Sequence, residues 1–351
     1  MVQMKKLLCF FLITLTLFTL CACNKTEGDT SSQVVETQDE TPAETQFETE
    51  TVTETATETT VTETETAPPS WESLNPVYEG ELLSHPNILN VMLFGTDAAG
   101  SLSDSMILMS VDSVHGKIKL VSFQRDTYVH ISSGFYHKLN YAYAAGGAAN
   151  AIRVIENNYG IKIDRYASVN FRTFRDIIDI LGGVEIELTA DEIGYINGQL
   201  QENGQSKHHL DAQAGTVKLN GTQALWHARN RGGTYGGVTY YGDDWDRTQR
   251  QRNLICAILR QFRYSSYNEL SQVIDIVSPL LTTDLCDAQM LSFIKGHAQD
   301  ILFYDVSGCS MPSSGNWSYG YNEAGSVILV NSWSSVRRDL QNYIYEDLII
   351  E

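Results

Sequence analysis

The chain has 351 residues, a formal net charge of -19 at pH 7 and a hydrophobic content of 42%. About 280 residues follow Trp71, which is enough for one large domain with a substantial core. The acidic composition gives no indication of nucleic-acid binding, which needs a basic surface, so we expect no nucleic-acid partner.

Residues 1–22 are predicted to be a signal peptide. Two lysines precede the apolar stretch Leu7–Leu20, which is shorter than the roughly 20 residues of a membrane span. Cys23 ends a Leu-Cys-Ala-Cys sequence that resembles the lipobox of bacterial lipoproteins. The resemblance implies a lipid on Cys23 that anchors the chain at the extracellular face of the cytoplasmic membrane. The alternatives are an uncleaved signal anchor and ordinary secretion.

Residues 23–75 are predicted to form a disordered tether. The stretch from residue 25 to residue 70 is rich in Thr and Glu and has 12 acidic residues against one lysine. Such a segment has too little apolar surface to offset the entropy that is lost on folding. We interpret it as a self-repelling spacer that holds the folded domain away from an anionic surface.

Residues 76–351 are predicted to form one large extracellular α/β domain. Apolar runs predict strands at Asn87–Gly95, Ser105–Asp112, Lys117–Phe123, Arg165–Phe171 and Val184–Leu188. Helices are predicted at Ala148–Tyr159, Thr173–Leu181, Leu219–Ala228 and Asp246–Phe262, followed by a further helix or two and a short strand. Alternating strands and helices favour a central mixed sheet with helices on both faces.

Three cysteines lie in this domain, and they do not have the spacing of a metal site. Cys256 belongs to an apolar helical run and is predicted to be a core residue. A disulfide between Cys286 and Cys309 is compatible with an extracellular location, and the sequence alone leaves it open.

Polar residues gather at the ends of the predicted strands. Asp97 follows the first strand, Asp104 opens the second, and Arg125 and Asp126 follow the third. Ligands of α/β sheets bind at such strand ends, where loops converge. A Gly-rich turn at Gly146–Gly147 is predicted just before a helix, where free backbone N–H groups favour an anion.

A second group of polar residues is rich in arginine and lies further along the chain. Its arginines are Arg229, Arg231, Arg247 and Arg250. Guanidinium groups match phosphate oxygens, and paired carboxylates with substrate phosphate are typical ligands of Mg²⁺. Together these residue types indicate a pyrophosphate site. Each motif taken alone is more often a turn, a helix cap or a solvated surface.

The motifs, in this order, resemble those of the LytR–CpsA–Psr family of cell-wall glycopolymer phosphotransferases. The matching segments are Asn87–Asp97, Ser103–Leu108, Val121–Tyr128, Lys138–Gly147, Leu181–Val184, Leu219–Leu225, Arg229–Arg231 and Asp244–Gln251. The resemblance implies that a glycopolymer is transferred from a polyprenyl-pyrophosphate carrier to peptidoglycan. It also implies an apolar pocket for the polyprenyl chain between the sheet and the helices.

The same resemblance implies roles for individual residues. Asp97 and Asp104 would hold Mg²⁺ or Mn²⁺. The implied catalytic residues are Asp97, Asp104, Arg125, Arg229 and Arg231. The implied phosphate-binding residues are Arg125, Lys138, Arg229, Arg231, Arg247, Arg250 and Gln251. Asp104 and Asp126 are both candidates for the general base.

The chain also departs from the family pattern. Ala98 and Leu102 stand where the family usually has arginine, and an insertion, Gly232–Gly242, follows the Arg-x-Arg motif. Two phosphate-facing arginines would then be absent, unless a residue such as His137 or Lys138 compensates. The alternatives to a transferase are therefore a non-catalytic binder of polyprenyl-phosphate lipid or wall glycan, and a pyrophosphate hydrolase.

Overall fold

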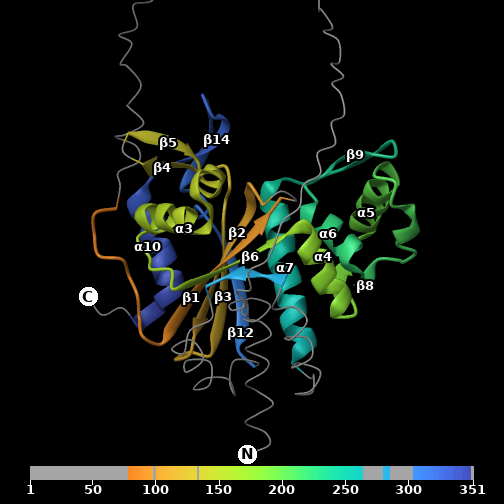
Figure 1. The fold of residues 1–351 in the computed structure, drawn as a ribbon, viewed down its shortest axis with the longest axis horizontal. Coiled ribbons are helices and arrows are strands. Elements are labelled where there is room, and N and C mark those ends of the chain that lie inside the picture. Colours follow the sequence, from red (N-terminus) through yellow and green to blue (C-terminus); the bar gives the residue numbers. More distant parts are fainter. Residues whose placement is uncertain (1–77, 98–99, 133, 264–279, 285–302, 349–351) are drawn as a thin grey trace, which may run out of the picture. The chain divides into compact units, whose positions relative to one another are not determined.

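The computed structural model describes residues 78–97, 100–132, 134–263, 280–284 and 303–348 (Figure 1). The predicted signal peptide, the predicted lipidation site Cys23 and the predicted tether lie outside these residues. No helix within the described ranges is both long enough and apolar enough to cross a membrane.

A mixed sheet forms the centre of the described part of the chain, with six strands in the order β11-β6-β1-β2-β3-β12. The strands are β1 (Ile88–Thr96), β2 (Ser103–Asp112), β3 (Lys117–Phe123), β6 (Arg165–Asn170), β11 (Thr282–Thr283) and β12 (Asp305–Met311). The strand β2 is antiparallel to β1 and β3, whereas β6 is parallel to β1 and β12 is parallel to β3. The mixed sheet predicted from the sequence is confirmed.

Helices and short hairpins surround this sheet. The helices are α3 (Leu139–Tyr159), α4 (Phe171–Ile180), α5 (Ala190–Glu202), α6 (Gly221–Arg229), α7 (Asp244–Phe262) and α10 (Trp333–Tyr345), with short 3-10 turns at Ser206–His208 and Glu346–Leu348. The hairpins pair β4 (Tyr128–Ser132) with β5 (Phe135–Lys138), β7 (Val184–Leu188) with β8 (Gly215–Leu219), β9 (Gly233–Tyr235) with β10 (Val238–Tyr240), and β13 (Trp317–Asn322) with β14 (Gly325–Val330).

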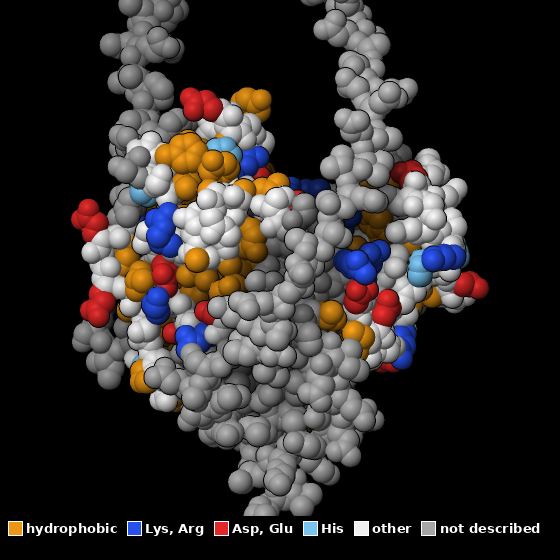
Figure 2. Space-filling model, viewed as in Figure 1, with side chains coloured by type: hydrophobic (Ala, Val, Ile, Leu, Met, Phe, Trp, Pro, Cys, Tyr) orange, Lys and Arg blue, Asp and Glu red, His pale blue; other side chains and the backbone are white. Residues whose placement is uncertain are grey.

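The two faces of the sheet are covered by different helices, as predicted (Figure 1). Alternate residues of β1 explain this arrangement, because successive side chains of a strand point to opposite faces. Met92 and Phe94 pack with α3 and α10, whereas Val91 and Leu93 pack with residues of α7. Hydrophobic side chains also gather over the β4–β5 hairpin at the upper left of the face shown in Figure 2.

The Gly-rich turn that was predicted to precede a helix is confirmed, because Gly146 and Gly147 have non-helical φ and ψ angles just before Ala148. The prediction missed a helical segment in front of this turn, so α3 as a whole begins at Leu139 and has a kink at the two glycines. Gly147 has a φ of 66°, which glycine adopts readily, so the chain bends there and then continues as the predicted helix to Tyr159. The left-handed Gly160 ends the helix, with a φ of 73°.

Further differences concern short elements and the cysteines. Leu219 ends β8 and does not begin a helix, since Asn220 caps α6 instead. The C-terminal part contains more strands than the single short one that was predicted. Cys256 lies on α7 and packs against the core, as predicted, and Cys309 carries a free thiol in β12. Cys286 lies outside the described residues.

Candidate functional site

One edge of the central sheet carries the predicted acidic and basic residues. The strands β1 and β3 end at the edge where the antiparallel β2 begins, and Gly95 of β1 lies opposite Ser105 of β2. Asp104 therefore lies at this edge, and Arg125 follows the end of β3. Arg125 Nη1 donates to Asp104 Oδ1 at 2.6 Å, so the predicted meeting of these two residues is confirmed.

Asp244 is the centre of a cluster of arginines around this edge. Arg247 Nη2 lies 2.9 Å from Asp244 Oδ2, and Arg125 Nε and Arg231 Nη1 lie 3.5 Å and 3.6 Å from Asp244 Oδ1. Burial lowers the pKa of Arg125, but the charges of Asp244 and Asp104 outweigh it and raise that pKa overall. One carboxylate thus keeps three guanidinium groups together.

The start of α7 places these groups. The side chain of Asp243 caps the helix by accepting from the N–H groups of Trp245 and Asp246. Residues three and seven positions after Asp244 lie on the same face of a helix, so Arg247 and Gln251 point in a similar direction. Gln251 Oε1 accepts from Ser105 Oγ at 2.9 Å, which joins this helix face to β2.

Arg247 is a buried cation. Its side chain is 4% exposed, and burial lowers its pKa to about 10, so it remains charged at neutral pH. Arg247 Nη2 also donates to the carbonyl oxygen of Asp104 at 2.9 Å. Within the described residues, the Nε atoms of Arg247 and Arg125 are buried and have no hydrogen-bond partner. These are desolvated donors of the kind that an anionic ligand would satisfy.

A cavity of about 210 Å³ opens beside the cluster, between the sheet and the helices α4, α6 and α7. Its polar end is lined by Asp104, Arg229, Arg231, Arg247 and Gln251. The remainder is almost entirely apolar and includes Leu93, Ile107, Met109, Phe171, Phe174, Ile177, Ile178, Leu225, Leu254, Ile258 and Leu259.

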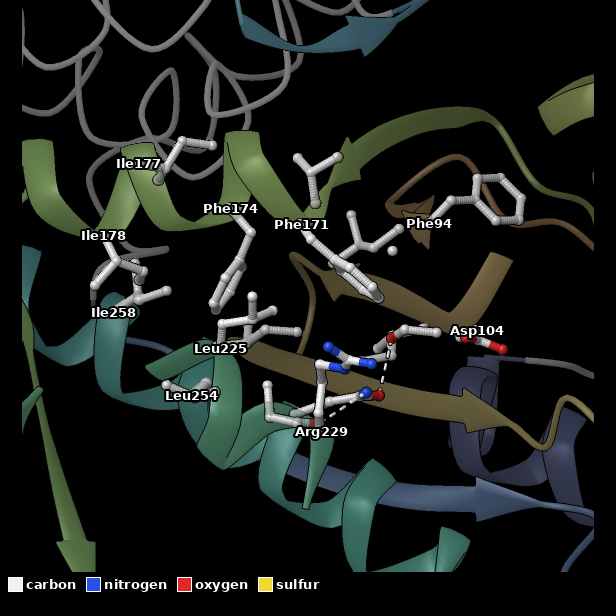
Figure 3. A pocket seen from close by; sticks show the side chains of 18 of the residues that line it. Phe94, Asp104, Phe171, Phe174, Ile177, Ile178, Leu225, Arg229, Leu254 and Ile258 are labelled. Carbon is white, nitrogen blue, oxygen red and sulfur yellow. Dashed lines mark hydrogen bonds between the residues drawn. The ribbon is translucent and has the colours of Figure 1, made fainter. Parts of the chain in front are cut away.

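Figure 3 shows the two ends of this cavity. Asp104 lies at the right of the view, Ile178 and Ile258 lie at the left, and Phe174 and Leu225 line the space between them. The apolar pocket that the family resemblance implied is therefore present between sheet and helices. A ligand that fills it would combine a charged or polar head with an apolar chain.

Arg229 links the polar end of the cavity to its aromatic wall. Its guanidinium carbon lies 4.7 Å from the ring centre of Phe171 and 5.0 Å from that of Trp226. Such cation–π contacts hold a cation against an aromatic face. The helix α6, which carries Arg229, lies close to α4. Gly221 allows this approach, since a Cβ at that position would meet the carbonyl oxygen of Arg175.

Three predicted phosphate-binding residues, Arg125, Lys138 and Arg250, do not line the cavity. Arg125 belongs to the cluster around Asp244 beside it, whereas the other two are directed elsewhere. Arg250 Nε pairs with Glu192 at 2.8 Å, and Arg250 Nη1 donates to the carbonyl oxygen of Asn230 at 3.1 Å. Lys138 Nζ pairs with Asp126 at 3.0 Å. The structure brings together Asp104, Arg125, Arg229, Arg231, Arg247 and Gln251, and it gives Arg250 a structural contact between α5 and α7.

Neither His137 nor Lys138, the two residues that could compensate for the missing arginines, offers a free positive charge. Leu102 is 39% exposed, and Ala98 lies outside the described residues. His137 is close to Tyr141, with 4.5 Å between ring centres, and burial lowers its pKa, which disfavours a charge at neutral pH. The charge of Lys138 is already paired with an acidic side chain.

Asp97 shapes the loop between β1 and β2. Its Oδ1 accepts from Ser101 N and its Oδ2 from Ser101 Oγ, both at 2.7 Å, and these bonds lower its pKa. Within the described ranges, neither Asp97 nor Asp104 belongs to a group of three His, Cys, Asp or Glu side chains that could share a metal ion. Asp97 follows β1 and Asp104 lies at the start of β2, so each offers a carboxylate at this end of the sheet. Carboxylates are ligands that Mg²⁺ takes together with phosphate oxygens and water.

Sequence analysis did not identify Asp244 or the aromatic lining of the cavity as functional. The Asp-x-x-Arg spacing at the start of α7 is the signal for Asp244, because it places a carboxylate next to Arg247 on one helix face. Phe171 was predicted to end a strand and Phe174 to lie in a helix, but both belong to α4 and line the cavity.

Comparison with known proteins identifies relatives. A model of the LytR_cpsA_psr family matches residues 45–330. The chain is 29% identical over 263 residues to the polyisoprenyl-teichoic acid–peptidoglycan teichoic acid transferase TagU of Bacillus cereus, a match that covers 71% of this chain and 79% of TagU. The enzyme of the same name from Enterococcus faecalis is 31% identical over 216 residues, which is 58% of this chain and 63% of that enzyme.

Solved structures share the fold. TagT bound to LIIa-WTA matches with a TM-score of 0.59 and 24% identity, covering 74% of this chain and 91% of TagT. YwtF (TagT) with bound octaprenyl pyrophosphate lipid matches with a TM-score of 0.55 and 22% identity, covering 76% of this chain and 94% of that protein. At these identities the likeness establishes the α/β fold.

Proposed function

The chain belongs to the LytR_cpsA_psr family, and we propose that it transfers a glycopolymer from a polyprenyl-pyrophosphate carrier to peptidoglycan. The relatives TagU are named as transferases of teichoic acid from a polyisoprenyl carrier to peptidoglycan. The observation that carries the proposal is the cavity with an arginine-lined end and an apolar end, which fits a lipid pyrophosphate. YwtF (TagT), which has a similar fold, has octaprenyl pyrophosphate bound.

The arrangement of charges suits the substrate's pyrophosphate. A pyrophosphate at the polar end would meet Arg229, Arg231 and Arg247, and it would satisfy the unpartnered Nε atom of Arg247. The polyprenyl chain would fill the apolar end between the sheet and α4, α6 and α7. Burial of Arg247 strengthens its attraction for phosphate, because few water molecules screen its charge.

In the proposed reaction, the glycan is transferred together with the phosphate that bears it. A hydroxyl oxygen of a peptidoglycan sugar attacks the phosphorus that bears the glycan, and a new phosphodiester bond forms. The bond from that phosphorus to the bridging oxygen breaks, and polyprenyl monophosphate leaves with the electron pair. The hydroxyl proton passes to a carboxylate of the cluster, either Asp104 or Asp126. The arginines stabilise the negative charge that grows on the leaving phosphate.

The metal requirement is part of this proposal. Asp97 and Asp104 would hold Mg²⁺, or Mn²⁺ in its place, together with substrate phosphate oxygens. The ion would neutralise phosphate charge and polarise the phosphoryl group. The proposed location is the extracellular face of the cytoplasmic membrane, with a lipid on Cys23 as the anchor. It is supported by the lipobox-like sequence at that cysteine and by the peptidoglycan named in the relatives' activity.

Product analysis tests the proposal. The full chain in detergent is mixed with a polyprenyl-pyrophosphate glycan, Mg²⁺ and a peptidoglycan oligomer, and lipid and glycan products are followed by mass spectrometry. A transferase releases polyprenyl monophosphate and joins the glycan phosphate to the oligomer. Release of free glycan phosphate would identify a hydrolase, and bound but intact substrate would identify a non-catalytic binder. Either result would contradict the proposal.

A further inference from the structure

A second cavity, of about 360 Å³, shares Arg229 and Arg231 with the first. Its other lining residues are Tyr195, Gln199, Asn203, Trp226, Gly232 and Tyr235. This lining differs in chemistry from that of the first cavity, because it combines aromatic rings, planar amides and arginines and contains no aliphatic side chain. The two arginines thus lie where an apolar cavity meets a polar one.

The insertion that distinguishes this chain from the family pattern builds one wall of the second cavity. It forms the hairpin β9–β10, which lies beside α5 (Figure 1). A Cβ on Gly198 would lie 2.7 Å from Tyr235 Cβ, and one on Gly194 would lie 2.8 Å from Tyr240 Oη. Two glycines one helical turn apart therefore let both tyrosines pack directly on α5, and this contact fixes the position of the wall.

Hydrogen bonds hold the polar groups of the cavity in place. Gln199, which is 7% exposed, donates from Nε2 to Tyr195 Oη at 3.1 Å and accepts at Oε1 from Asn203 Nδ2 at 3.2 Å. The rings of Tyr195 and Tyr235 meet edge to face, with centroids 5.2 Å apart. Trp226 Nε1 donates to Gln205 Oε1 at 2.8 Å, which fixes the indole ring. The result is a preformed set of rings and amides.

This chemistry fits a sugar. Sugar hydroxyls donate and accept hydrogen bonds, as amide side chains do, and the C–H faces of a sugar ring pack on aromatic rings. The lining includes no carboxylate, and its two arginines suit a sugar that carries a phosphate. An apolar ligand would displace water from the amide and guanidinium groups without offering them hydrogen bonds in return, which is unfavourable.

We propose that the second cavity binds the sugars of the lipid-linked donor that lie next to its pyrophosphate. This inference rests on the proposed function, which places the polyprenyl chain in the first cavity and the pyrophosphate at its arginines. The group on the far phosphate then extends toward the second cavity, which is lined by the same two arginines, Arg229 and Arg231. The hairpin β9–β10 would thereby contribute to the choice of glycopolymer.

Binding measurements without turnover test the inference. The full chain in detergent is titrated with octaprenyl pyrophosphate and with octaprenyl pyrophosphate that carries a disaccharide. Tyr235→Ala and Gln199→Met alter two different elements of the cavity, and Tyr241→Ala is the matched control, because Tyr241 is 88% exposed and does not line it. We expect both cavity variants to bind the glycan-bearing lipid at least 10-fold more weakly, while the bare lipid changes less than 2-fold and the control matches the wild type.

Three results would overturn the inference. In the first, both cavity variants keep the wild-type ratio of the two affinities. In the second, donor affinity is unchanged but the KM for a peptidoglycan oligomer rises, which would assign the cavity to the acceptor. In the third, the wild type binds neither lipid, and the proposed function fails as well. Donor binding that shows the expected pattern without any transfer would contradict only the transferase activity, so the two failures are distinguishable.

Discussion

Arg125 Nη1 and Asp104 Oδ1 are 2.6 Å apart, so the arginine after β3 is paired with the acid at the start of β2. The same guanidinium group also lies near Asp126 and Asp244, each 3.5 Å from its Nε atom. These acids fix the side chain before any substrate is bound. A preorganised cation of this kind stabilises charge in a transition state without a further cost of reorientation.

The first prediction concerns the shape of this cation. Arg125→Lys keeps the charge but removes the planar fork that contacts phosphate and Asp104 together. We expect the single-turnover transfer rate to fall by about 100-fold or more, as for the loss of one oxyanion donor. Arg172→Lys on α4 is the matched control, because Arg172 is 83% exposed and should give the wild-type rate. A wild-type rate for Arg125→Lys would exclude this role.

The second prediction concerns the metal. Chelation with EDTA should abolish transfer, and Asp97→Asn should raise the Mg²⁺ concentration needed for half-maximal rate by about 10-fold or more, because an amide binds a hard cation less well than a carboxylate. Ser101→Ala removes the hydrogen bond to Asp97 Oδ2 but keeps the carboxylate. It therefore separates the loop contact from metal binding. An equal Mg²⁺ requirement in the wild type and Asp97→Asn would show that Asp97 is not a ligand.

The third prediction concerns the apolar end of the cavity. Ile258→Trp adds side-chain volume next to Ile178, where the end of a polyprenyl chain would lie. Each buried CH₂ group contributes about 0.8 kcal/mol, so the loss of even a few should weaken a long lipid by at least about 10-fold. A two-unit prenyl pyrophosphate should bind as in the wild type. Isothermal titration with both lipids measures the difference, and equal weakening of both would argue against lipid at this end.

The fourth prediction concerns pH and stability. Burial lowers the pKa of His227 to about 4, against an ordinary value near 6.5, and both ring nitrogens are buried without a hydrogen-bond partner in the described structure. The charge of Glu192 opposes this shift, and that of Arg250 adds to it. The unfolded chain therefore binds a proton more tightly than the folded chain. The contribution of the neutral His227 to the free energy of unfolding should be fully present above pH 6.5. The free energy of unfolding should fall, by up to about 1.4 kcal/mol per pH unit, as the pH drops from 6.5 to 4.

Denaturant titrations across this pH range check that prediction. His227→Phe should reduce the slope of unfolding free energy against pH, whereas the exposed His209→Phe should leave it unchanged. Part of the slope should remain, because burial also lowers the pKa values of His130 and His137. An unchanged slope in His227→Phe would contradict the assignment.

Much of the sheet could be predicted from the sequence because β1, β2 and β3 are rich in apolar residues and follow one another along the chain. Local patterns also located Asp104 and Arg125, since both lie where such a run begins or ends. The hairpin β9–β10 could not be predicted in this way. Its strands have three residues each, and their position depends on Gly194 and Gly198 of α5, which are distant in sequence.

The sequence alone also did not show which arginine of α7 faces the cavity. Arg247 and Arg250 are three positions apart on α7, and periodicity alone allows either to face a ligand. Arg247 points to the cavity because Asp104 and Asp244 surround it, whereas Glu192 of α5 takes Arg250. Only tertiary contacts decide between the two.

The most direct test of the central claim compares the wild type with Asp104→Asn in transfer from a polyprenyl-pyrophosphate glycan to a peptidoglycan oligomer. The account predicts that the wild type releases polyprenyl monophosphate in step with glycan attachment. Asp104→Asn should lower both by about 100-fold or more while the unfolding transition is retained. Equal transfer by the two proteins, or no transfer by the wild type, would contradict the account.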